Sequence, residues 1–397
     1  MAAEHAADVI VVGSGVMGAA AAWRLARAGH RVRLLEQFAI GHENGSSHGP
    51  SRMIRLAYDA LDYAHLGREA FRLWDELQAE SGESLLRMTG GLDVGLPGAL
   101  AMEGIARTYD TLGMPYERLD RDELRRRYPQ LNLPDGSIGL AQADYGILAA
   151  GRCVTTLAAR ARAAGAQLHE EEPALEIVPD GDGVQVRTAR GVYGAERVIL
   201  TAGSWTNPLL APLGIDLPLT VLQEQLAFFR VRDPEAHGPD RLPLVIHRFP
   251  GTTSLGSIFP IHDHEGVKVM VDRIGPAVDP ANPDRTIDPL LLERLRAYTT
   301  DVLPGVTGEI LESTSCRFTM TPDEDFVIDL HPEHHQIVIA SACSGHGFKF
   351  APVIGQMLAD LALTGATPYP TDRFRLDRPA LAESWSPAQA SVVSRES

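Results

Sequence analysis

The chain has 397 residues, of which 44% are hydrophobic and 22% charged, and this suits a globular protein of about two domains. Its formal net charge of −16 disfavours nucleic acids and anionic membrane surfaces as partners. Three widely spaced cysteines match neither a disulfide framework nor a zinc site, the N-terminal segment lacks the basic region of a signal peptide, and no apolar run could cross a bilayer. We therefore expect a cytoplasmic protein without a metal site.

The first predicted elements are a strand, a helix and a second strand. Residues 8–12, "DVIVV", form a continuous apolar run, which is typical of a strand buried on both faces of a parallel sheet. An alanine-rich segment then predicts a helix that ends at Ala28, with Gly29 as its cap. The second strand is predicted at residues 31–36, "RVRLLE". This order is typical of the first unit of a dinucleotide-binding sheet.

Three glycines between the first strand and the helix have the spacing G-x-G-x-x-G. Gly13 permits the tight turn, Gly15 lets the backbone approach a pyrophosphate, and Gly18 lets the helix pack closely on the strand. The helix N-terminus offers free N–H groups to the phosphates. Glu36 ends the second strand, where a carboxylate accepts hydrogen bonds from ribose hydroxyls. The pattern predicts a dinucleotide site, in which the acid disfavours NADP and leaves NAD and FAD open.

The later elements are of two types. A second α/β unit is predicted within residues 145–217, where a helix leads into a strand and a hairpin precedes another strand. The other segments are rich in strands, with helices predicted at 121–129, "RDELRRRYP", and at 289–303. The predicted α/β fold is therefore discontinuous, with a dinucleotide-binding domain of residues 1–85, 145–217 and 319–380, a second domain of residues 86–144 and 218–318, and a polar tail of residues 381–397.

Only two of the 36 basic residues are lysines, Lys268 and Lys349, and all the others are arginines. Arginine serves as well as lysine at the surface, so surface charge does not account for them. An ammonium group is more compact than a guanidinium group, and its pKa shifts more readily on burial. The two positions therefore indicate sites that need a compact cation, although chance survival in an arginine-rich chain explains either lysine alone equally well.

Five segments together resemble one protein family. They are "DVIVVGSGVMGAAAAWRLARAGHRVRLLEQ", "NGSSHGPSRMIRLAY", "VILTAGSWTNPLL", "SCRFTMTPDEDFVIDLHPEH" and "SGHGFKFAPVIGQMLADLALTG". With these segments the sequence resembles the monomeric sarcosine oxidase and N-methyltryptophan oxidase family of FAD-dependent amine oxidases over roughly residues 7–385. The last two segments are specific to that family. The resemblance implies a Rossmann-like FAD-binding domain, with a parallel sheet and helices, and a substrate domain on a mixed, mainly antiparallel sheet.

The resemblance also implies how FAD is held. In the family, FAD is joined covalently through its 8α-methyl group to a cysteine, and the matching residue here is Cys316. A cysteine without this context would be interpreted as a small buried hydrophobic residue, and we interpret Cys153 and Cys343 in that way. The loop "NGSSHGPSRMIR" is expected to cover the flavin. The further cofactor contacts implied are His48, Arg52, Gly345, Gly347 and Phe348.

Two of these contacts have alternative interpretations. Arg52 could instead form a surface salt bridge, and His48 could be a loop histidine whose hydrogen bonds are already satisfied. If the resemblance holds, His48 is also a candidate catalytic residue beside the flavin.

Three cations match catalytic positions of the family. Lys349 falls on a lysine that binds the substrate carboxylate beside the flavin, and Arg55 falls on its partner arginine. Together they would form a strong clamp, because charge-assisted hydrogen bonds are about twice as strong as neutral ones. Lys268 falls on the lysine that activates O2, where a fixed cation stabilises the anion that forms as O2 is reduced. The alternative for Lys268 is an exposed charge at a strand end.

The pocket for the substrate side chain departs from the family pattern. By ungapped extension, a tyrosine, a histidine and a second tyrosine are replaced by Ser257, Asp272 and Phe318. Serine opens volume, and the carboxylate of Asp272 either faces a second positive group or points to solvent. We therefore doubt sarcosine as the substrate. We expect another secondary, N-methyl or cyclic amino acid that is held by its carboxylate.

The expected activity is that of a monomeric FAD enzyme that oxidises a C–N bond to an imine and reduces O2 to H2O2. One alternative is a dehydrogenase that passes electrons to a quinone or a protein, and Lys268 argues against it. Another is a non-catalytic flavin-binding protein, which would have no need of both lysines, Arg55 and Cys316. The third is an NAD-dependent dehydrogenase, which the cysteine and the discontinuous domain disfavour.

Overall fold

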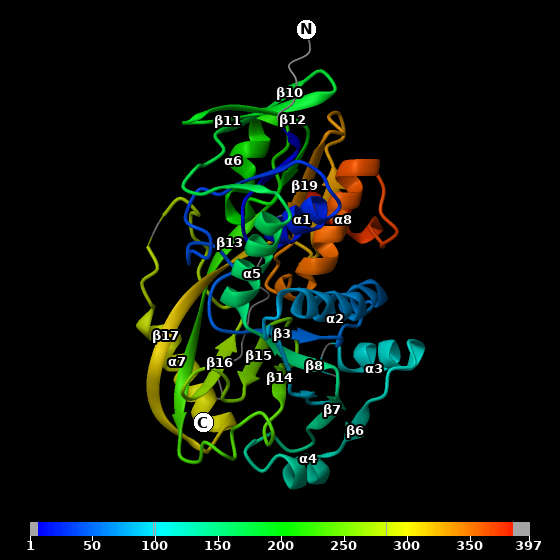
Figure 1. Cartoon of the computed structure of the whole chain (residues 1–397). Coiled ribbons are helices and arrows are strands. Elements are labelled where there is room, and N and C mark those ends of the chain that lie inside the picture. The colour runs from blue at the N-terminus through cyan, green and yellow to red at the C-terminus, as the bar shows by residue number, and fades with distance from the viewer. Residues whose placement is uncertain (1–6, 98, 100, 283, 384–397) are drawn as a thin grey trace.

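The computed structural model describes residues 7–383 except 98, 100 and 283, so the predicted tail lies outside the described residues from residue 384 on. The structure is built around two large sheets of eight strands each. Figure 1 shows them one above the other, with the helix α2 (Leu61–Ser81) at the level between them. No helix in this part of the chain is long and apolar enough to span a membrane.

The first sheet is built around β1 (Ala7–Val12), which pairs in parallel with β2 (Val32–Leu35) and β12 (Gly191–Leu200). A further parallel strand, β19 (Ile337–Ser341), lies beside β12. Antiparallel hairpin strands and one short parallel strand complete the sheet. These strands are β9 (Gln167–His169), β10 (Glu176–Asp180), β11 (Gly183–Thr188) and β18 (Val327–Leu330).

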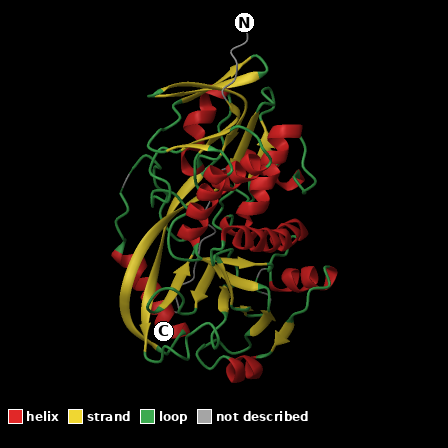
Figure 2. Ribbon diagram, viewed as in Figure 1, coloured by secondary structure: helices red, strands yellow, loops and turns green. Residues whose placement is uncertain are grey.

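Both faces of β1 are buried, as its apolar sequence predicts. Val9 and Val11 belong to a core shared with the helices on one side of the sheet, whereas Ile10 and Val12 belong to a core on the other side. The helices on the first side are α1 (Val16–Arg27), α5 (Ala150–Ala163) and α8 (Ala351–Thr364), and α6 (Thr206–Leu210) lies on the second side. Figure 2 shows these helices gathered around the upper strands.

Helix α1 ends at Arg27, one residue before the predicted end, and Ala28 is its cap residue. Gly29 has φ +91°, and its N–H donates to Ala26 O at 2.9 Å. The next N–H, of His30, donates to Leu25 O at 3.1 Å. These two reversed hydrogen bonds form a Schellman motif, which requires a left-handed residue and therefore favours glycine at this position.

The second sheet is mixed and mainly antiparallel, and it confirms the predicted fold class. Its order is β17-β13-β16-β15-β14-β5-β7-β6, and only the pair β14–β5 is parallel. Figure 1 shows β17 as a long strand that curves along one side. The strands are β5 (Gly91–Gly95), β6 (Glu117–Leu119), β7 (Ile138–Gln142), β13 (Thr220–Val231), β14 (Leu244–Arg248), β15 (Leu255–Phe259), β16 (Val267–Val271) and β17 (Val306–Met320). The helices in these segments are α3 (Met102–Thr111), α4 (Arg121–Arg127) and α7 (Pro289–Val302).

A small third sheet contains β3 (Arg52–Arg55), β8 (Tyr145–Leu148) and β4 (Leu86–Met88). Strand β8 pairs with both of the others. Strand β4 comes from the segment 86–144, which was predicted to belong to the second domain, yet it pairs with a strand of the segment 145–217. The exact domain boundaries stay a prediction.

Candidate active site

A cavity of about 1190 Å³ lies between the carboxyl ends of the parallel strands and one face of the mixed sheet. It is larger than the roughly 300–1,000 Å³ of most small-molecule pockets. Of the predicted site residues, only Gly18 does not line it. Those that line it are Gly13, Gly15, Glu36, His48, Arg52, Arg55, Ser257, Lys268, Asp272, Cys316, Phe318, Gly345, Gly347, Phe348 and Lys349.

The glycine-rich turn between β1 and α1 leaves no room for side chains at two of its glycines. Gly13 has φ +96°, and a Cβ there would lie 2.6 Å from Thr201 O. A Cβ on Gly18 would lie 1.9 Å from Gly13 O, so Gly18 sits behind the turn and not on the cavity wall. Gly15 faces the cavity, where a Cβ would lie 3.3 Å from Ser47 Oγ. The turn therefore presents backbone at the N-terminus of α1.

Glu36 holds this turn in place from the end of β2. Its Oε2 accepts a hydrogen bond from Ser14 N–H at 2.7 Å, and its Oε1 accepts one from Phe38 N–H at 2.9 Å. His42 Nε2 lies 3.4 Å from Oε1. Glu36 is buried, lines the cavity, and each oxygen has a second lone pair for a ligand hydroxyl.

One face of the mixed sheet forms the opposite wall. Because side chains alternate between the faces of a strand, residues two apart point the same way. Paired residues of neighbouring strands share a face, and the register joins Ser257 to Met270 and Phe259 to Lys268. The residues of these strands that line the cavity are Leu226, Leu255, Ser257, Phe259, Lys268, Met270, Cys316 and Phe318.

Lys268 is buried, not exposed at a strand end. Its Nζ donates to Ser51 O at 2.9 Å and to Ser51 Oγ at 3.1 Å, and it lies 4.4 Å from the centre of the Phe259 ring. Burial, followed by the nearby Arg52 guanidinium, holds the pKa of Lys268 well below its usual value. No carboxylate of the described residues forms an ion pair with it. Lys268 is thus a compact buried cation site with neutral partners.

Lys349 and Arg55 meet at one aromatic ring. Lys349 Nζ donates to Tyr58 Oη at 3.0 Å and to His346 O at 2.5 Å. The Arg55 guanidinium lies 4.4 Å from the centre of the same tyrosine ring and donates to Ala57 O. Both cations are buried, Arg55 Nε has no hydrogen-bond partner among the described residues, and neither side chain reaches a carboxylate there. Burial and the neighbouring Arg55 hold the pKa of Lys349 well below its usual value.

The loop before β3 places His48 and Arg52 at the cavity. His48 is buried, its Nε2 has no partner in the described part of the chain, and burial with the nearby Arg52 and Arg285 lowers its pKa to about 3, so the ring is neutral at pH 7. Arg52 donates to Ser51 O and Ser46 O at 2.9 and 3.0 Å. It makes no salt bridge with a described residue, contrary to the surface alternative.

The three cysteines lie in different surroundings. Cys316 is a buried free thiol on β17, and burial raises its pKa to about 11, although the nearby Arg52 lowers it. Cys153 lies in the core beside α1, as expected for a packing residue. Cys343 is partly buried and lines the cavity, and its Sγ accepts a hydrogen bond from Thr319 N–H at 3.4 Å, so its packing role stays a prediction.

Asp272 does not point to solvent. Its Oδ2 lies 2.5 Å from Arg273 Nη1, and its Oδ1 accepts a hydrogen bond from Leu255 N–H at 2.7 Å. Arg273 Nε also lies 3.0 Å from Glu324 Oε1. Both Arg273 and Glu324 have left-handed backbone, with φ of +61° and +62°, a strain that clusters at functional sites. Of the two alternatives, the positive group is therefore present, and it is the adjacent arginine.

Sequence reasoning missed several residues that shape this cavity. Arg273 directly follows Asp272, so "VDRIG" gave a signal of a local ion pair. Tyr58 had no such signal, because it meets Lys349 only in the folded chain. Another missed pair joins Arg248 to Asp93, with Arg248 Nη2 2.6 Å from Asp93 Oδ1, and Tyr145 Oη donates to the other oxygen. An aspartate inside the apolar strand "GLDVG" was the available signal.

Comparison with known proteins points to one family. A family model described as FAD dependent oxidoreductase matches residues 8–361. The chain is 34% identical to a monomeric sarcosine oxidase of Bacillus sp. (strain B-0618), over 95% of this chain and 97% of that protein. It is also 34% identical to the N-methyl-L-tryptophan oxidase of Salmonella arizonae, over 94% and 98%. The solved open form of NikD, an unusual amino acid oxidase essential for nikkomycin biosynthesis, matches with a TM-score of 0.82 at 31% identity, over 93% of this chain and 97% of that one.

The buried pair of Arg248 and Asp93 yields a prediction about stability. Arg248→Met would leave a fully buried carboxylate without its cation, and we expect it to lower the free energy of unfolding by about 3–5 kcal/mol. Urea denaturation of the full chain measures the change. The control is Arg87→Met, which removes an exposed arginine that lies 3.7 Å from Asp240 and should cost less than about 1 kcal/mol. Equal costs would show that the pair does not contribute through burial.

Proposed function

This chain belongs to the FAD dependent oxidoreductase family, and we propose that it is an oxidase of a secondary, N-methyl or cyclic amino acid. The observation that carries the proposal is the pair of buried cations, Lys349 and Arg55, in the same cavity as the glycine-rich turn and without a carboxylate partner among the described residues. We infer further that the enzyme acts as a monomer in the cytoplasm, and that it uses O2.

The cavity fits FAD on several counts. Its volume exceeds that of an ordinary pocket, and one end of it is the N-terminus of a helix with a close backbone turn, which suits a pyrophosphate. Glu36 has lone pairs for a ribose hydroxyl. Two buried polar atoms along the wall, Ser14 Oγ and His48 Nε2, have no partner among the described residues. Because such atoms are costly to leave unpaired, they favour a polar ligand at this wall.

Lys349 and Arg55 would hold the substrate by its carboxylate. An arginine fork and an ammonium beside it make charge-assisted hydrogen bonds, which fix both the position and the direction of the acid. Burial now holds the pKa of Lys349 down, and an anion beside it would raise that pKa again. Carboxylate binding and protonation of Lys349 therefore support each other. The clamp orients the carbon next to nitrogen, which is how positioning lowers a barrier.

The chemistry of the bound cofactor completes the proposal. Bound FAD would accept a hydride from the C–H bond next to nitrogen, which leaves an imine, and would pass two electrons to O2, which gives H2O2. Lys268 would provide a fixed positive charge where negative charge develops on O2, and its hydrogen bonds to Ser51 hold the ammonium in place. His48, neutral at pH 7, would donate or accept one hydrogen bond at the flavin without adding charge.

The substrate end of the cavity favours a molecule larger than sarcosine. Ser257 contributes a small side chain, and Phe318 packs against Gly345, where a Cβ would lie 2.8 Å from the ring. Asp272 is already paired with Arg273, so it shapes the pocket as half of an ion pair and not as a free carboxylate. Relatives named for N-methyl-L-tryptophan and for an unusual amino acid oxidase support a pocket that varies within the family.

The clamp predicts that amides and simple amines are poor substrates. Leaving buried cations without their anion costs roughly 2–5 kcal/mol, which is about 30-fold to several thousand-fold in apparent affinity. Anaerobic flavin bleaching by an N-methyl amino acid and by its amide measures the difference. Arg55→Ala should remove the preference for the acid, and Arg107→Ala, an exposed arginine of α3, should keep it. Lys349→Arg should also lose flavin reduction by the acid, although it keeps the positive charge. The guanidinium group is bulkier than the ammonium group that packs between Tyr58 and His346. Equal bleaching by acid and amide in the wild type would refute the clamp.

Substitution of Lys268 should affect the oxidative half-reaction far more than the reductive half-reaction. Lys268→Met keeps the length of the side chain and removes its charge, so it should slow reoxidation of the flavin by O2 on the order of 10²–10³-fold while reduction by substrate changes far less. Stopped-flow absorbance follows each half-reaction by itself. Equal slowing of both would mean that Lys268 only positions the site, and wild-type flavin that is reoxidised by an artificial acceptor but not by air would identify a dehydrogenase.

We also propose that Cys316 forms a thioether to the 8α-carbon of FAD. Cys316 is the buried free thiol on the cavity wall formed by the mixed sheet, which supports this choice. Flavin should remain with the polypeptide after acid precipitation of the wild type. Cys316→Ala should bind FAD in the native state and release it in acid, while Cys343→Ala, the neighbouring thiol, should retain it. Release of all flavin from folded wild-type protein contradicts the linkage.

A further inference from the structure

A carboxylic acid lies beside Cys316 that the proposed reaction does not use. The register of β13 and β17 pairs Glu224 directly with Cys316. Directly opposite residues of antiparallel strands point to the same face, with Cβ atoms about 4.5–5.5 Å apart. Leu222, two residues before Glu224, packs in the same small cluster as Cys316, and Leu226, two residues after it, lines the cavity. The side chains of Glu224 and Cys316 are therefore neighbours on the cavity side of the sheet.

Glu224 is buried, and one of its two carboxyl oxygens has no hydrogen-bond partner among the described residues. It has no exposed surface, and its Oε1 accepts a hydrogen bond from Gly275 N–H at 3.2 Å. Its Oε2 is buried and has no hydrogen-bond partner among the described residues. Burial and the nearby Asp272 raise the pKa of Glu224 to about 8, so its carboxylate is an unusually strong base. A buried polar atom without a hydrogen-bond partner lowers the stability of the fold, and a purely structural role for Glu224 does not explain why that loss of stability is tolerated.

Cys316 needs such a neighbour. The thiolate, not the thiol, is the nucleophile of cysteine chemistry. Because burial raises the pKa of Cys316 to about 11, the thiolate makes up only about one part in ten thousand at pH 7. Bond formation at the sulfur therefore requires removal of a proton that water in a buried site removes poorly.

We propose that Glu224 is the base that takes the thiol proton of Cys316 as the sulfur bonds to the 8α-carbon of FAD. This inference rests on the covalent attachment proposed above. The new bond is C–S, and the bonds broken are S–H and one C–H of the 8α-methyl group. Two electrons remain on the flavin and pass to O2, so that the thiol, the methyl group and O2 give the thioether and H2O2.

The surrounding charges favour this proton transfer. Cations near Cys316 stabilise its thiolate. The carboxylate near Glu224 stabilises the protonated form of Glu224, so Glu224 accepts a proton more readily. After the transfer, a neutral acid and a thiolate lie side by side, and the cations remain on the side of the sulfur. The titratable groups concerned are Asp272 and Arg273 toward Glu224, and Arg52, Lys268, Arg285 and Cys343 toward Cys316.

The test follows attachment of FAD to full-length protein produced without flavin in riboflavin-starved cells. FAD is added in air between pH 6 and pH 10, and acid-stable flavin and the mass of the peptide that contains Cys316 are measured over time. Wild-type attachment should speed up with a midpoint near pH 8, where Glu224 loses its proton. Glu224→Gln keeps an acceptor for Gly275 N–H and should slow attachment at pH 7 about 10²-fold, with no midpoint near pH 8.

Controls keep the outcomes separate. Quenching of FAD fluorescence shows that each variant binds the cofactor. Glu312→Gln removes an exposed carboxylate of β17, the strand that carries Cys316, and should attach FAD at the wild-type rate. Wild-type attachment that does not change with pH, or Glu224→Gln protein that attaches FAD at the wild-type rate, overturns the role of Glu224 and leaves Cys316 as the attachment site. Wild-type protein that binds FAD but never attaches it overturns the linkage and this inference together, while substrate oxidation still tests the oxidase.

Discussion

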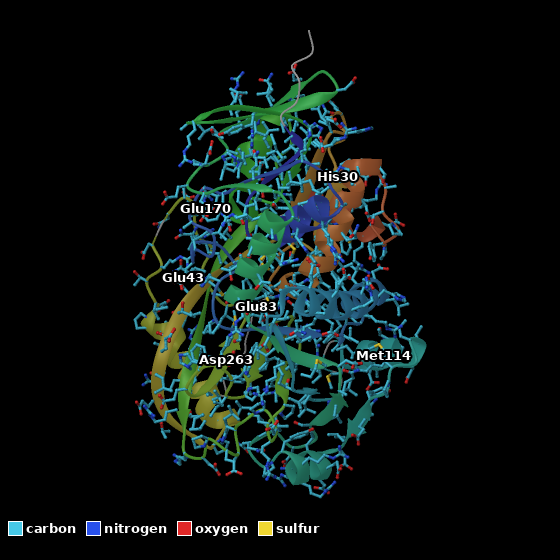
Figure 3. The ribbon with its side chains drawn as sticks, in the orientation of Figure 1. His30, Glu43, Glu83, Met114, Glu170 and Asp263 are labelled. Carbon is cyan, nitrogen blue, oxygen red and sulfur yellow. The ribbon has the colours of Figure 1, made fainter. Side chains whose placement is uncertain are left out.

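Three buried cations that pair with no carboxylate of the described residues are the main physical constraint on the cavity of this protein. Lys268, Lys349 and Arg55 lie in one cavity, and their hydrogen-bond acceptors in the described part of the chain are carbonyl and hydroxyl oxygens. Burial of an unpaired cation costs several kcal/mol even after relaxation, and the lowered pKa of both lysines reflects that cost. A negative group that entered the cavity would offset this cost. The outer surface differs, with acidic side chains such as Glu83 and Asp263 exposed there (Figure 3).

Elsewhere in the same cavity the chain pairs its buried arginines. Arg248 lies against Asp93, and Arg273 lies between Asp272 and Glu324. The fold can therefore place a carboxylate opposite a buried guanidinium, and it does so next to the unpaired cations. The paired arginines hold strands and loops of the wall together, whereas Arg55 and Lys349 stay available to a ligand. Under the proposed function, this division into paired and unpaired cations would give the cavity a preferred orientation for an acid.

The mixed sheet sets the spacing of these groups through its alternation. Side chains alternate between the two faces of a strand, and Lys268 and Cys316 lie at positions that face the cavity. A shift of the strand register by one residue would turn both side chains toward the core behind the sheet. The parallel sheet contributes the glycine-rich turn at the carboxyl ends of its strands, where ligands of open α/β sheets bind. A dinucleotide placed on the turn would extend across this face, so one cofactor would contact both sheets.

The sequence by itself determined those features of this protein that depend on residues close together in the chain. The apolar run of β1, the Schellman end of α1 at Gly29 and the glycine spacing follow from backbone geometry, and resemblance added the family and the mixed sheet. Only tertiary structure decided that Lys349 meets Tyr58, that Cys343 lines the cavity and that Glu224 lies beside Cys316. These contacts join residues 291 apart in one case and 92 apart in another, and no local pattern encodes them. They arise from strand register and sheet packing, which side chains across the whole molecule settle together.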